Sequence, residues 1–322
     1  MEAIPGLLSV VRIIFSISRF YNTSERITSL LVKVTNQMIT SCRDYIYKNE
    51  PRIWEQDLPV VKGKFRLIYQ LKILYQDCFE KEKKRLLENN TGNQFEVSET
   101  SIFGKFDMFC GRMNKIEEMM TSIERWSVLQ NCKIDGIEFI NVAFRDILSV
   151  TIKKPYDVFN TRKNDFDMDN NRFCQNLFNL LGSLNNFFDV SFAQHSQVLH
   201  ALQYLAKFEK IKEVGLDLSS KYKTCLSMFS QEIEQVRKNY HSVRSDPPLR
   251  RNLPPMAGRI IWARQLFARI EGPIVMFQAA IPSLLLSADA REVVNSYNKM
   301  GRVLVEYELM FYDKFVFFII HL

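Results

Sequence analysis

The chain has 322 residues, of which 47% are hydrophobic and 25% charged, a mixture typical of globular proteins that excludes an intrinsically disordered chain. The formal net charge of +7 is compatible with a polyanionic partner, but the charges are spread along the sequence. The densest basic run, Lys81–Arg85, contains Glu82 and therefore favours a solvated helix face over a nucleic-acid site. With 11 glycines, 10 prolines and 25 phenylalanines, the composition indicates long helices joined by few connections.

The first half of the chain carries apolar residues at helical spacing. A helix is predicted to begin at Ser24, a residue type that caps helix N-termini, and to continue to Tyr47. Strand-like alternation is almost absent, so the fold class is predicted to be all-α. Further helices are predicted at about 63–89, 101–128 and 137–152, with Pro51 and the polar residues 88–93 as breaks.

The polar stretch 156–171 is the most loop-like segment and marks the predicted internal boundary. We therefore expect a first helical bundle in residues 1–160 and a second in 161–312, followed by an apolar end in 313–322. Helices of the second half are predicted near 171–188, 194–208, 219–243, 256–271, 274–287 and 291–318.

One stretch, RNLPPMAGRIIWARQLFARIEGPI (Arg251–Ile274), alternates arginines with large apolar residues. Its proline pair predicts a helix start, and Gly272-Pro273 predicts a helix stop. The pattern fits three kinds of segment: a nucleic-acid helix, a membrane-surface helix, or one helix of a packed assembly. The packed helix is favoured, because the apolar residues form one stripe and the arginines fall mostly off it. The stripe comprises Ile260, Ala263, Phe267, Ile270 and Ile274, widened by Trp262 and Leu266.

Sequence signatures of nucleotide binding are missing. Gly63-Lys64 and Gly104-Lys105 lack the earlier glycine of a phosphate-binding loop, and no Gly-x-Gly-x-x-Gly occurs. No Gly-x-Ser-x-Gly turn marks a nucleophile. The chain is therefore not predicted to be an enzyme, and no catalytic or cofactor-binding residue is proposed.

Metal-binding patterns are incomplete as well. His195 and His200 are five residues apart, a spacing that places them on different faces of a helix. The run DFDMDN from Asp165 resembles the start of a calcium loop, but Asn170 replaces the turn glycine and Asn176 the bidentate glutamate. The six cysteines form no Cys-x-x-Cys pair and suit reduced thiols in a cytosolic protein. No metal site is predicted.

No targeting or membrane segment is predicted either. Glu2 stands where a signal peptide is positively charged, and Arg12 splits the apolar run that follows. The closing run FVFFIIHL is too short to span a bilayer.

Four blocks of sequence resemble the N-terminal tail of dynein heavy chains, most closely that of axonemal outer-arm chains of the gamma type. The blocks follow the family's order and cover the chain to about Tyr312. They are SRFYNTSERITSLLVKVTNQMITSC (Ser18–Cys42), FEVSETSIFGKFDMFCGRMNKI (Phe95–Ile116), DPPLRRNLPPMAGRIIWARQLFARIEGPI (Asp246–Ile274) and YNKMGRVLVEYEL (Tyr297–Leu309).

The resemblance implies a non-catalytic stem, built as an elongated array of successive antiparallel helical bundles. In this family the stem joins heavy chains to each other, carries intermediate and light chains, and attaches the motor to its cargo. For an axonemal chain the cargo is a doublet microtubule of a cilium or flagellum, reached indirectly through the complex. The implied partners are therefore other heavy chains and intermediate and light chains, with no nucleic acid and no membrane. The implied location is the cytoplasm and cytoskeleton, in the axoneme.

A second interpretation is an ATP-dependent, minus-end-directed microtubule motor subunit, the activity of the whole family. The family's AAA+ ring, stalk and microtubule-binding tip have no counterpart in these 322 residues, which favours the stem. After Tyr312 the sequence DKFVFFIIHL leaves the family's pattern. We therefore expect a short isoform, a partial gene model or a fragment.

Under the stem interpretation, the partner surface is expected to be an apolar helix face with a charged rim. Three residues of the 251–274 stretch are candidate contacts: Trp262, Arg264 and Phe267. Tryptophan and arginine are enriched at binding hot spots, although burial inside the bundle explains Trp262 and Phe267 equally well.

Overall fold

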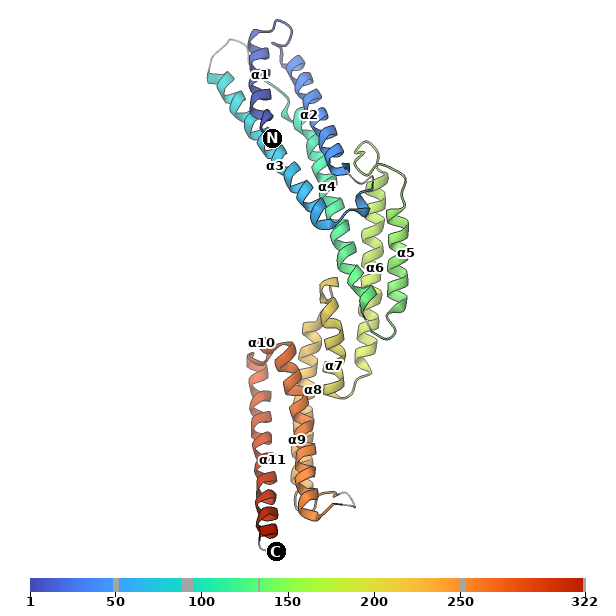
Figure 1. The fold of residues 1–322 in the computed structure, drawn as a ribbon, viewed down its shortest axis with the longest axis vertical. Coiled ribbons are helices and arrows are strands. Elements are labelled where there is room, and N and C mark those ends of the chain that lie inside the picture. Colours follow the sequence, from blue (N-terminus) through green and yellow to red (C-terminus); the bar gives the residue numbers. More distant parts are fainter. Residues whose placement is uncertain (49–51, 89–94, 133, 250–252, 321–322) are drawn as a thin grey trace. The chain divides into compact units, whose positions relative to one another are not determined.

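A computed structural model describes residues 1–320 except 49–51, 89–94, 133 and 250–252, with only the backbone at 315 and 318–320. In these residues all regular structure is helical, with eleven α-helices and no strand, which confirms the all-α prediction (Figure 1). The predicted breaks at Pro51 and at 89–93, and the first two residues of the 251–274 stretch, lie outside the described residues.

The chain forms two compact units, each continuous in space but not in sequence. The first unit comprises Met1–Ser127 and Val142–Phe178, and the second comprises Val128–Asn141 and Asn179–Leu322. These units do not coincide with the predicted division at residue 160, so independent folding of 1–160 and 161–312 stays a prediction.

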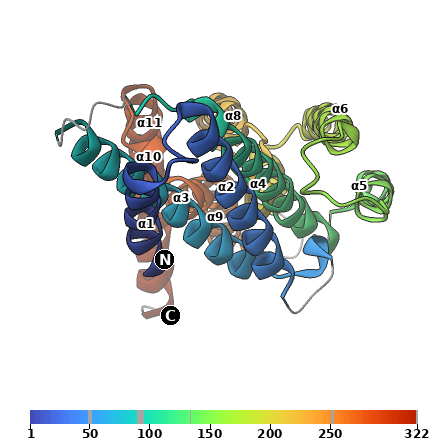
Figure 2. The same ribbon diagram turned by 90° about the horizontal axis from the view of Figure 1, so that it is seen from above.

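Four long helices dominate the first unit. They are α1 (Ala3–Ile17), α2 (Ser24–Tyr47), α3 (Leu58–Glu88) and α4 (Glu99–Ser127), with parts of α5 (Glu138–Ile152) and α6 (Asp165–Ala193) and the short η1 (Ile53–Glu55). Successive members of α1 to α4 run in opposite directions; α1 packs on α3, and α2 and α3 pack on α4 (Figures 1 and 2).

The start of α2 agrees with the prediction, but its N-cap is Thr23 instead of Ser24, without a side-chain cap hydrogen bond. The sequence analysis did not predict α1.

Aromatic side chains form the core of the first unit. Rings from α1, α3, α4 and the segment before α4 follow one another at centroid distances of 5.0 to 6.2 Å. The hydroxyls of Tyr75 and Thr35, both buried, lie 3.1 Å apart and link α3 to α2. Each fully buried ring contributes about 1.5–3 kcal/mol of hydrophobic stabilisation, so this cluster accounts for much of the unit's cohesion. The rings belong to Phe15, Tyr75, Phe79, Phe95 and Phe103.

The prediction of a loop over 156–171 is correct only for its first part. Residues 156–164 are not helical, but α6 begins at Asp165, so the prediction was wrong for 165–171. Phe166 and Phe173 are buried seven residues apart, which gives the segment a helical inner face. Asp165 and Asp167 lie in the first turn, where the helix dipole stabilises negative charge. The polar residues that suggested a loop therefore favour a helix start.

The second unit contains the end of α6 and the remaining helices. The helices are α7 (Val198–Phe208), α8 (Leu218–Val243), α9 (Pro255–Ala280), α10 (Pro282–Leu285) and α11 (Ala288–Ile320), with η2 (Val128–Asn131) and η3 (Glu209–Val214). Helix α9 packs against α7, α8 and α11, and α11 runs antiparallel to it after the short α10 (Figure 1).

The predicted helix stop at Gly272-Pro273 is wrong, because α9 continues through both residues to Ala280. Pro273 removes one backbone donor at a cost of about 3 kcal/mol. The buried side chains of Ile270, Ile274 and Phe277 lie on both sides of the pair, and their burial outweighs that local cost. Gly272 has a packing role instead: a Cβ there would lie 3.4 Å from the side chain of Leu199 on α7.

Candidate partner-binding surface

Helix α9 carries the three residues singled out from the sequence, and the structure gives each a different environment. Pro254 is the N-cap and Pro255 the first helical residue, as the proline pair predicted. Apart from the half-buried Phe267, the residues of the apolar stripe are buried. Arg264 and Arg269 are exposed and form ion pairs with Glu308 of α11 and Glu232 of α8. Residues 255–274 therefore belong to a packed helix with a basic outer edge.

Trp262 is a core residue with 6% of its surface exposed. Its ring stacks on Tyr240 of α8 at 6.1 Å and meets the edge of Tyr307 of α11 at 5.6 Å. Aromatic pairs in such geometries contribute about 0.5–1.5 kcal/mol beyond their burial. This three-ring cluster joins α8, α9 and α11, so Trp262 reaches a partner only if the cluster opens.

Arg259 closes the end of α8 beside this cluster. Its guanidinium donates to the backbone carbonyls of Arg244 and Ser245, at 3.4 and 2.9 Å, where α8 leaves its carbonyls without helical partners. The Tyr307 hydroxyl donates to the Arg244 carbonyl at 3.0 Å. A cation at a helix C-terminus is also favoured by the helix dipole. Arg259 is therefore a capping residue of α8.

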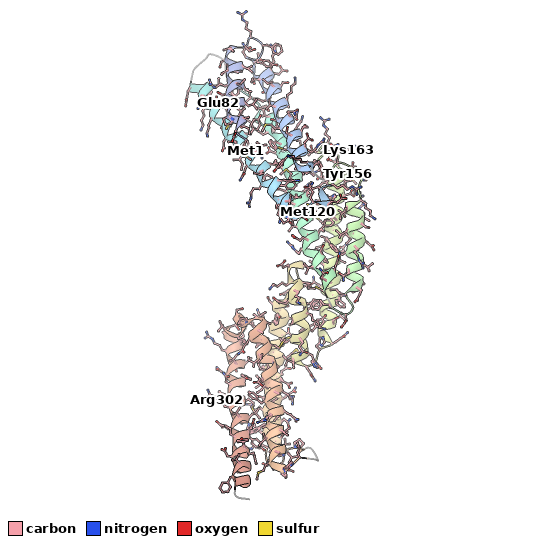
Figure 3. All side chains as sticks on the ribbon, in the orientation of Figure 1. Met1, Glu82, Met120, Tyr156, Lys163 and Arg302 are labelled. Atoms are coloured by element: carbon pink, nitrogen blue, oxygen red, sulfur yellow. The ribbon has the colours of Figure 1, made fainter. Side chains whose placement is uncertain are left out.

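Phe267 and Arg264 lie on the outer side of α9. Phe267 is half-buried and contributes to an open groove of about 410 Å³ between α9 and α11. Gly301 of α11 lies against its ring: a Cβ at that glycine would be 3.3 Å from a ring carbon of Phe267. Arg302, labelled in Figure 3, lines the groove with Glu306. The α9–α11 groove is lined by Phe267, Tyr297, Asn298, Gly301, Arg302, Val305 and Glu306.

The sequence analysis missed the α11 side of this groove. Tyr297, Gly301 and Val305 recur every four residues, a spacing that places them on one helix face. A glycine between two larger residues on such a face signals a close approach, so this pattern could have been found from the sequence.

Two of the three aspartates in the calcium-loop-like run contact cationic side chains or a hydroxyl of the protein. Asp167 accepts from Arg112 at 2.6 Å and from Lys115 at 2.7 Å. Asp169 accepts from the Tyr156 hydroxyl at 2.8 Å and pairs with Lys154 at 3.2 Å. The Tyr156 pKa is raised by burial and by this carboxylate. These aspartates therefore anchor the connection before α6, whose Tyr156 and Lys163 are labelled in Figure 3.

The other residues considered for chemistry are dispersed. His195 lies in the connection before α7 with its ring on Tyr204, whereas His200 is exposed on α7. No group of three potential metal ligands occurs in the described part of the chain. Both Gly-Lys pairs lie inside long helices, α3 and α4, and not in loops at helix starts.

The six cysteines are free thiols. Burial raises the pKa of Cys42 and of Cys110 to about 11, and that of Cys225 to about 12. These buried thiols are therefore poor nucleophiles. Within the described residues, no helix is long and apolar enough to cross a bilayer.

The fold and this surface define an all-helical protein whose helices pack on one another, with an open groove between α9 and α11. Residues 1–320 match the family described as dynein heavy chain, N-terminal region 1. The chain therefore belongs to the dynein heavy chain family. The match runs past Tyr312, where the resemblance was expected to end.

Relatives similar to this chain over nearly its whole length are also dynein heavy chains. The chain is 41% identical to dynein axonemal heavy chain 5 of Mus musculus over 97% of its length, and 39% identical to dynein axonemal heavy chain 8 of Homo sapiens over 98%. It is 32% identical to the dynein gamma chain of the flagellar outer arm of Chlamydomonas reinhardtii over 98%. The chain spans only 7% of the length of each of these relatives.

Proposed function

We propose that this chain is a non-catalytic stem segment of an axonemal dynein heavy chain. It associates with other heavy chains and holds intermediate and light chains for ciliary or flagellar movement. Through that complex it attaches to the doublet microtubule in the axoneme. The observation that carries this proposal is the family match over residues 1–320, together with relatives named as axonemal and outer-arm chains.

The α9–α11 groove is the proposed contact for a partner helix. Phe267, Tyr297 and Val305 give it an apolar floor, and Arg302 and Glu306 give it charges of both signs at the rim. An apolar centre with a charged rim is the usual composition of a protein interface. Arg264 lies on the same side of α9, and it would extend the rim by exchanging Glu308 for a carboxylate of the partner.

Affinity capture tests the proposal. Tagged residues 1–322 are incubated with a lysate of ciliated cells, and recovered proteins are quantified by mass spectrometry. Recovery of axonemal intermediate chains or a second dynein heavy chain is expected, and recovery of chaperones alone would contradict the proposal.

Two variants test whether the α9–α11 groove is the contact for the partner chains. Phe267→Ala and Arg264→Ala are expected to lower recovery of the partner chains by about tenfold if both are interface hot spots. Phe178→Ala is the matched control, because Phe178 is an exposed phenylalanine on α6, far from α9 in sequence. Equal recovery with all three variants would remove the groove from the proposal and leave the stem function standing.

The stem and motor interpretations differ in whether the chain hydrolyses ATP. Purified residues 1–322 are expected to hydrolyse no ATP in the presence of Mg²⁺, because neither Gly-Lys pair is placed to cradle phosphates. Turnover that co-purifies with the chain and is lost when the chain is unfolded would contradict a non-catalytic stem.

A further inference from the structure

A second open groove lies within the second unit, between the segment that follows η2 and the helical stretch of α7 and η3. Its volume of about 520 Å³ suits a ligand the size of a short peptide. Cys132 lines it from the first segment, and Lys207 of α7 and Lys210 of η3 line it from the second. We call it the Cys132 groove; Asn131, Ile134, Gln203 and Ala206 complete its lining.

The two lysines give this groove a positive charge that is not compensated in the described part of the chain. Both side chains are exposed, and neither takes part in an ion pair there. The carboxylate of the neighbouring Glu209 is held by Lys212 at 2.6 Å. A groove lined by charge of one sign raises the local concentration of ligands of the opposite sign. The expected ligand is therefore an anion.

Cys132 differs from the other five thiols in its surroundings. Four of them are buried, and Cys174 is exposed. Burial and the negative charge of Glu118 both raise the pKa of Cys174. Burial also raises the pKa of the partly exposed Cys132, but the positive charge of Lys210 offsets part of that increase. Reactive cysteines lie in partly exposed and positively charged surroundings, which only Cys132 has among these thiols.

We propose that Cys132 is a modification site for small anionic disulfides of the glutathione disulfide class, whose carboxylates are bound by Lys207 and Lys210. The Cys132 thiol, which donates to the Val128 carbonyl at 3.3 Å, first gives its proton to the solvent. The thiolate then attacks one sulfur of the disulfide. A new S–S bond joins Cys132 to that half, the original S–S bond breaks, and the other half leaves as a thiolate.

The incoming disulfide is therefore the oxidant, and no further co-reactant is needed. The product is a mixed disulfide that a thiol can reverse. It places carboxylates beside Lys207 and Lys210 and so removes the positive charge of the groove. The modification would change the surface of the second unit where η2 packs on η3.

A comparison of two disulfide reagents tests the proposal. A Cys174→Ser chain reports on Cys132, and a Cys132→Ser chain reports on Cys174. Each purified chain is treated with dithiobis(nitrobenzoate), which carries two carboxylates, or with the uncharged dithiodipyridine, and labelling is followed by peptide mass spectrometry. The ratio of the anionic to the uncharged rate constant should be about tenfold higher at Cys132 than at Cys174. Equal ratios at the two cysteines would overturn the proposal.

The lysines are tested in the Cys174→Ser chain. Lys207→Gln with Lys210→Gln should remove the advantage of the anionic reagent at Cys132 and leave the rate of the uncharged reagent nearly unchanged. Lys238→Gln with Lys299→Gln is the matched control, because these lysines are also exposed in the second unit, lie outside the groove and carry the same charge. If the two double variants lose the advantage equally, net charge rather than the groove is responsible and the proposal fails.

Glutathione disulfide itself is the third probe. In the original chain, one glutathionyl group is expected on Cys132 before any forms on the more exposed Cys174, and dithiothreitol should remove it. Raising the salt concentration should reduce this preference, because salt screens exposed charges. Modification of Cys174 first would contradict the assignment of the site.

This site goes beyond the proposed stem function, because it is measured with the purified chain alone. Failure to capture axonemal chains would contradict the stem function and leave the Cys132 site standing. Equal reactivity ratios in a chain that captures them would do the reverse.

Discussion

The two units hold their irregular segments by different means. In the first unit, the connection before α6 is fixed by a buried cation: Arg112, 5% exposed, donates to the Val158 carbonyl at 3.0 Å and to Asp167 at 2.6 Å. In the second unit, the end of α8 is fixed by the rings of Tyr240, Trp262 and Tyr307, with the cation of Arg259 at the edge.

This difference between the units indicates where loss of a charged side chain should lower stability. Removing the buried Arg112 leaves the Val158 carbonyl without its donor and leaves Asp167 paired with Lys115 alone, which costs several kcal/mol at most. Removing an exposed arginine from a surface ion pair costs little, because water replaces it. Arg112 should therefore resemble a core residue in its effect on stability, whereas Arg264 should not.

The largest effect is expected from the ring cluster. Trp262→Ala should lower the free energy of unfolding by about 3–5 kcal/mol, because it leaves a cavity between α8, α9 and α11. Urea unfolding followed by circular dichroism measures this change. Arg264→Ala, two residues along the same helix, should leave the midpoint unchanged; an equal loss in both variants would contradict the comparison.

The buried cation comes next. Arg112→Met keeps an apolar stem of similar length and should lower the free energy of unfolding by about 2–3 kcal/mol, less than for a fully buried pair because Asp167 remains partly exposed. The double variant Arg112→Met, Asp167→Asn should recover part of this loss in the same urea experiment. Additive losses would show that the two side chains do not stabilise each other.

Two glycines give smaller effects of opposite sign in the second unit. Gly215 has φ of +114° after η3, so Gly215→Ala should lower the free energy of unfolding by about 1 kcal/mol or more. Gly182 lies within α6 with no atom within 4 Å of an added Cβ, so Gly182→Ala should raise it by about 0.5–1 kcal/mol. Thermal unfolding of the two variants measures both changes: the melting temperature should fall for Gly215→Ala and rise for Gly182→Ala. Changes in the same direction would contradict the different roles given to the two glycines.

Alkaline pH is expected to lower the stability of both units. The pKa of Cys42 and Cys110 is raised by burial from 9.0 to about 11, and that of Cys225 to about 12. Between pH 9 and 11 these thiols ionise in the unfolded chain but not in the folded one. Stability is therefore full below about pH 9 and falls as the pH rises toward 11.

Urea midpoints at pH 8 and pH 10.5 measure this loss. A Cys225→Ala chain should lose less between the two pH values than the original chain. An equal midpoint at both pH values in the original chain would contradict the raised pKa values.

Helical periodicity was sufficient to predict most of the fold. The helix predicted at Ser24–Tyr47 has those bounds in the structure, because one apolar stripe without interruption determines it. Residues that usually end helices or form loops were less reliable guides to the helix boundaries. Gly272-Pro273 looked like a stop, but packing on both sides of the pair decided the outcome. Asp165 and Asp167 looked like a loop, but their charges suit a helix N-terminus.

The candidate surface was only partly predictable. Composition selected Trp262, Arg264 and Phe267 on one helix, but it cannot tell a core ring from a surface ring. The structure separates them, since Trp262 contacts two rings of neighbouring helices and Phe267 borders an open groove. The α11 residues that complete the groove are 30 or more positions away, and a pairing between distant helices is not visible in either helix alone.

The proline inside α9 also has a mechanical consequence. Without an amide hydrogen at Pro273, one rung of the hydrogen-bond ladder is missing between two turns that are otherwise regular. A helix bends at least cost where a rung is missing, so a load along α9 would be taken up there. Since α7 packs closely against the preceding Gly272, this compliant point lies inside the unit, although the carbonyl that it leaves without a donor belongs to the exposed Arg269. Helix α9 is therefore expected to bend at Pro273, with a regular helical segment on each side.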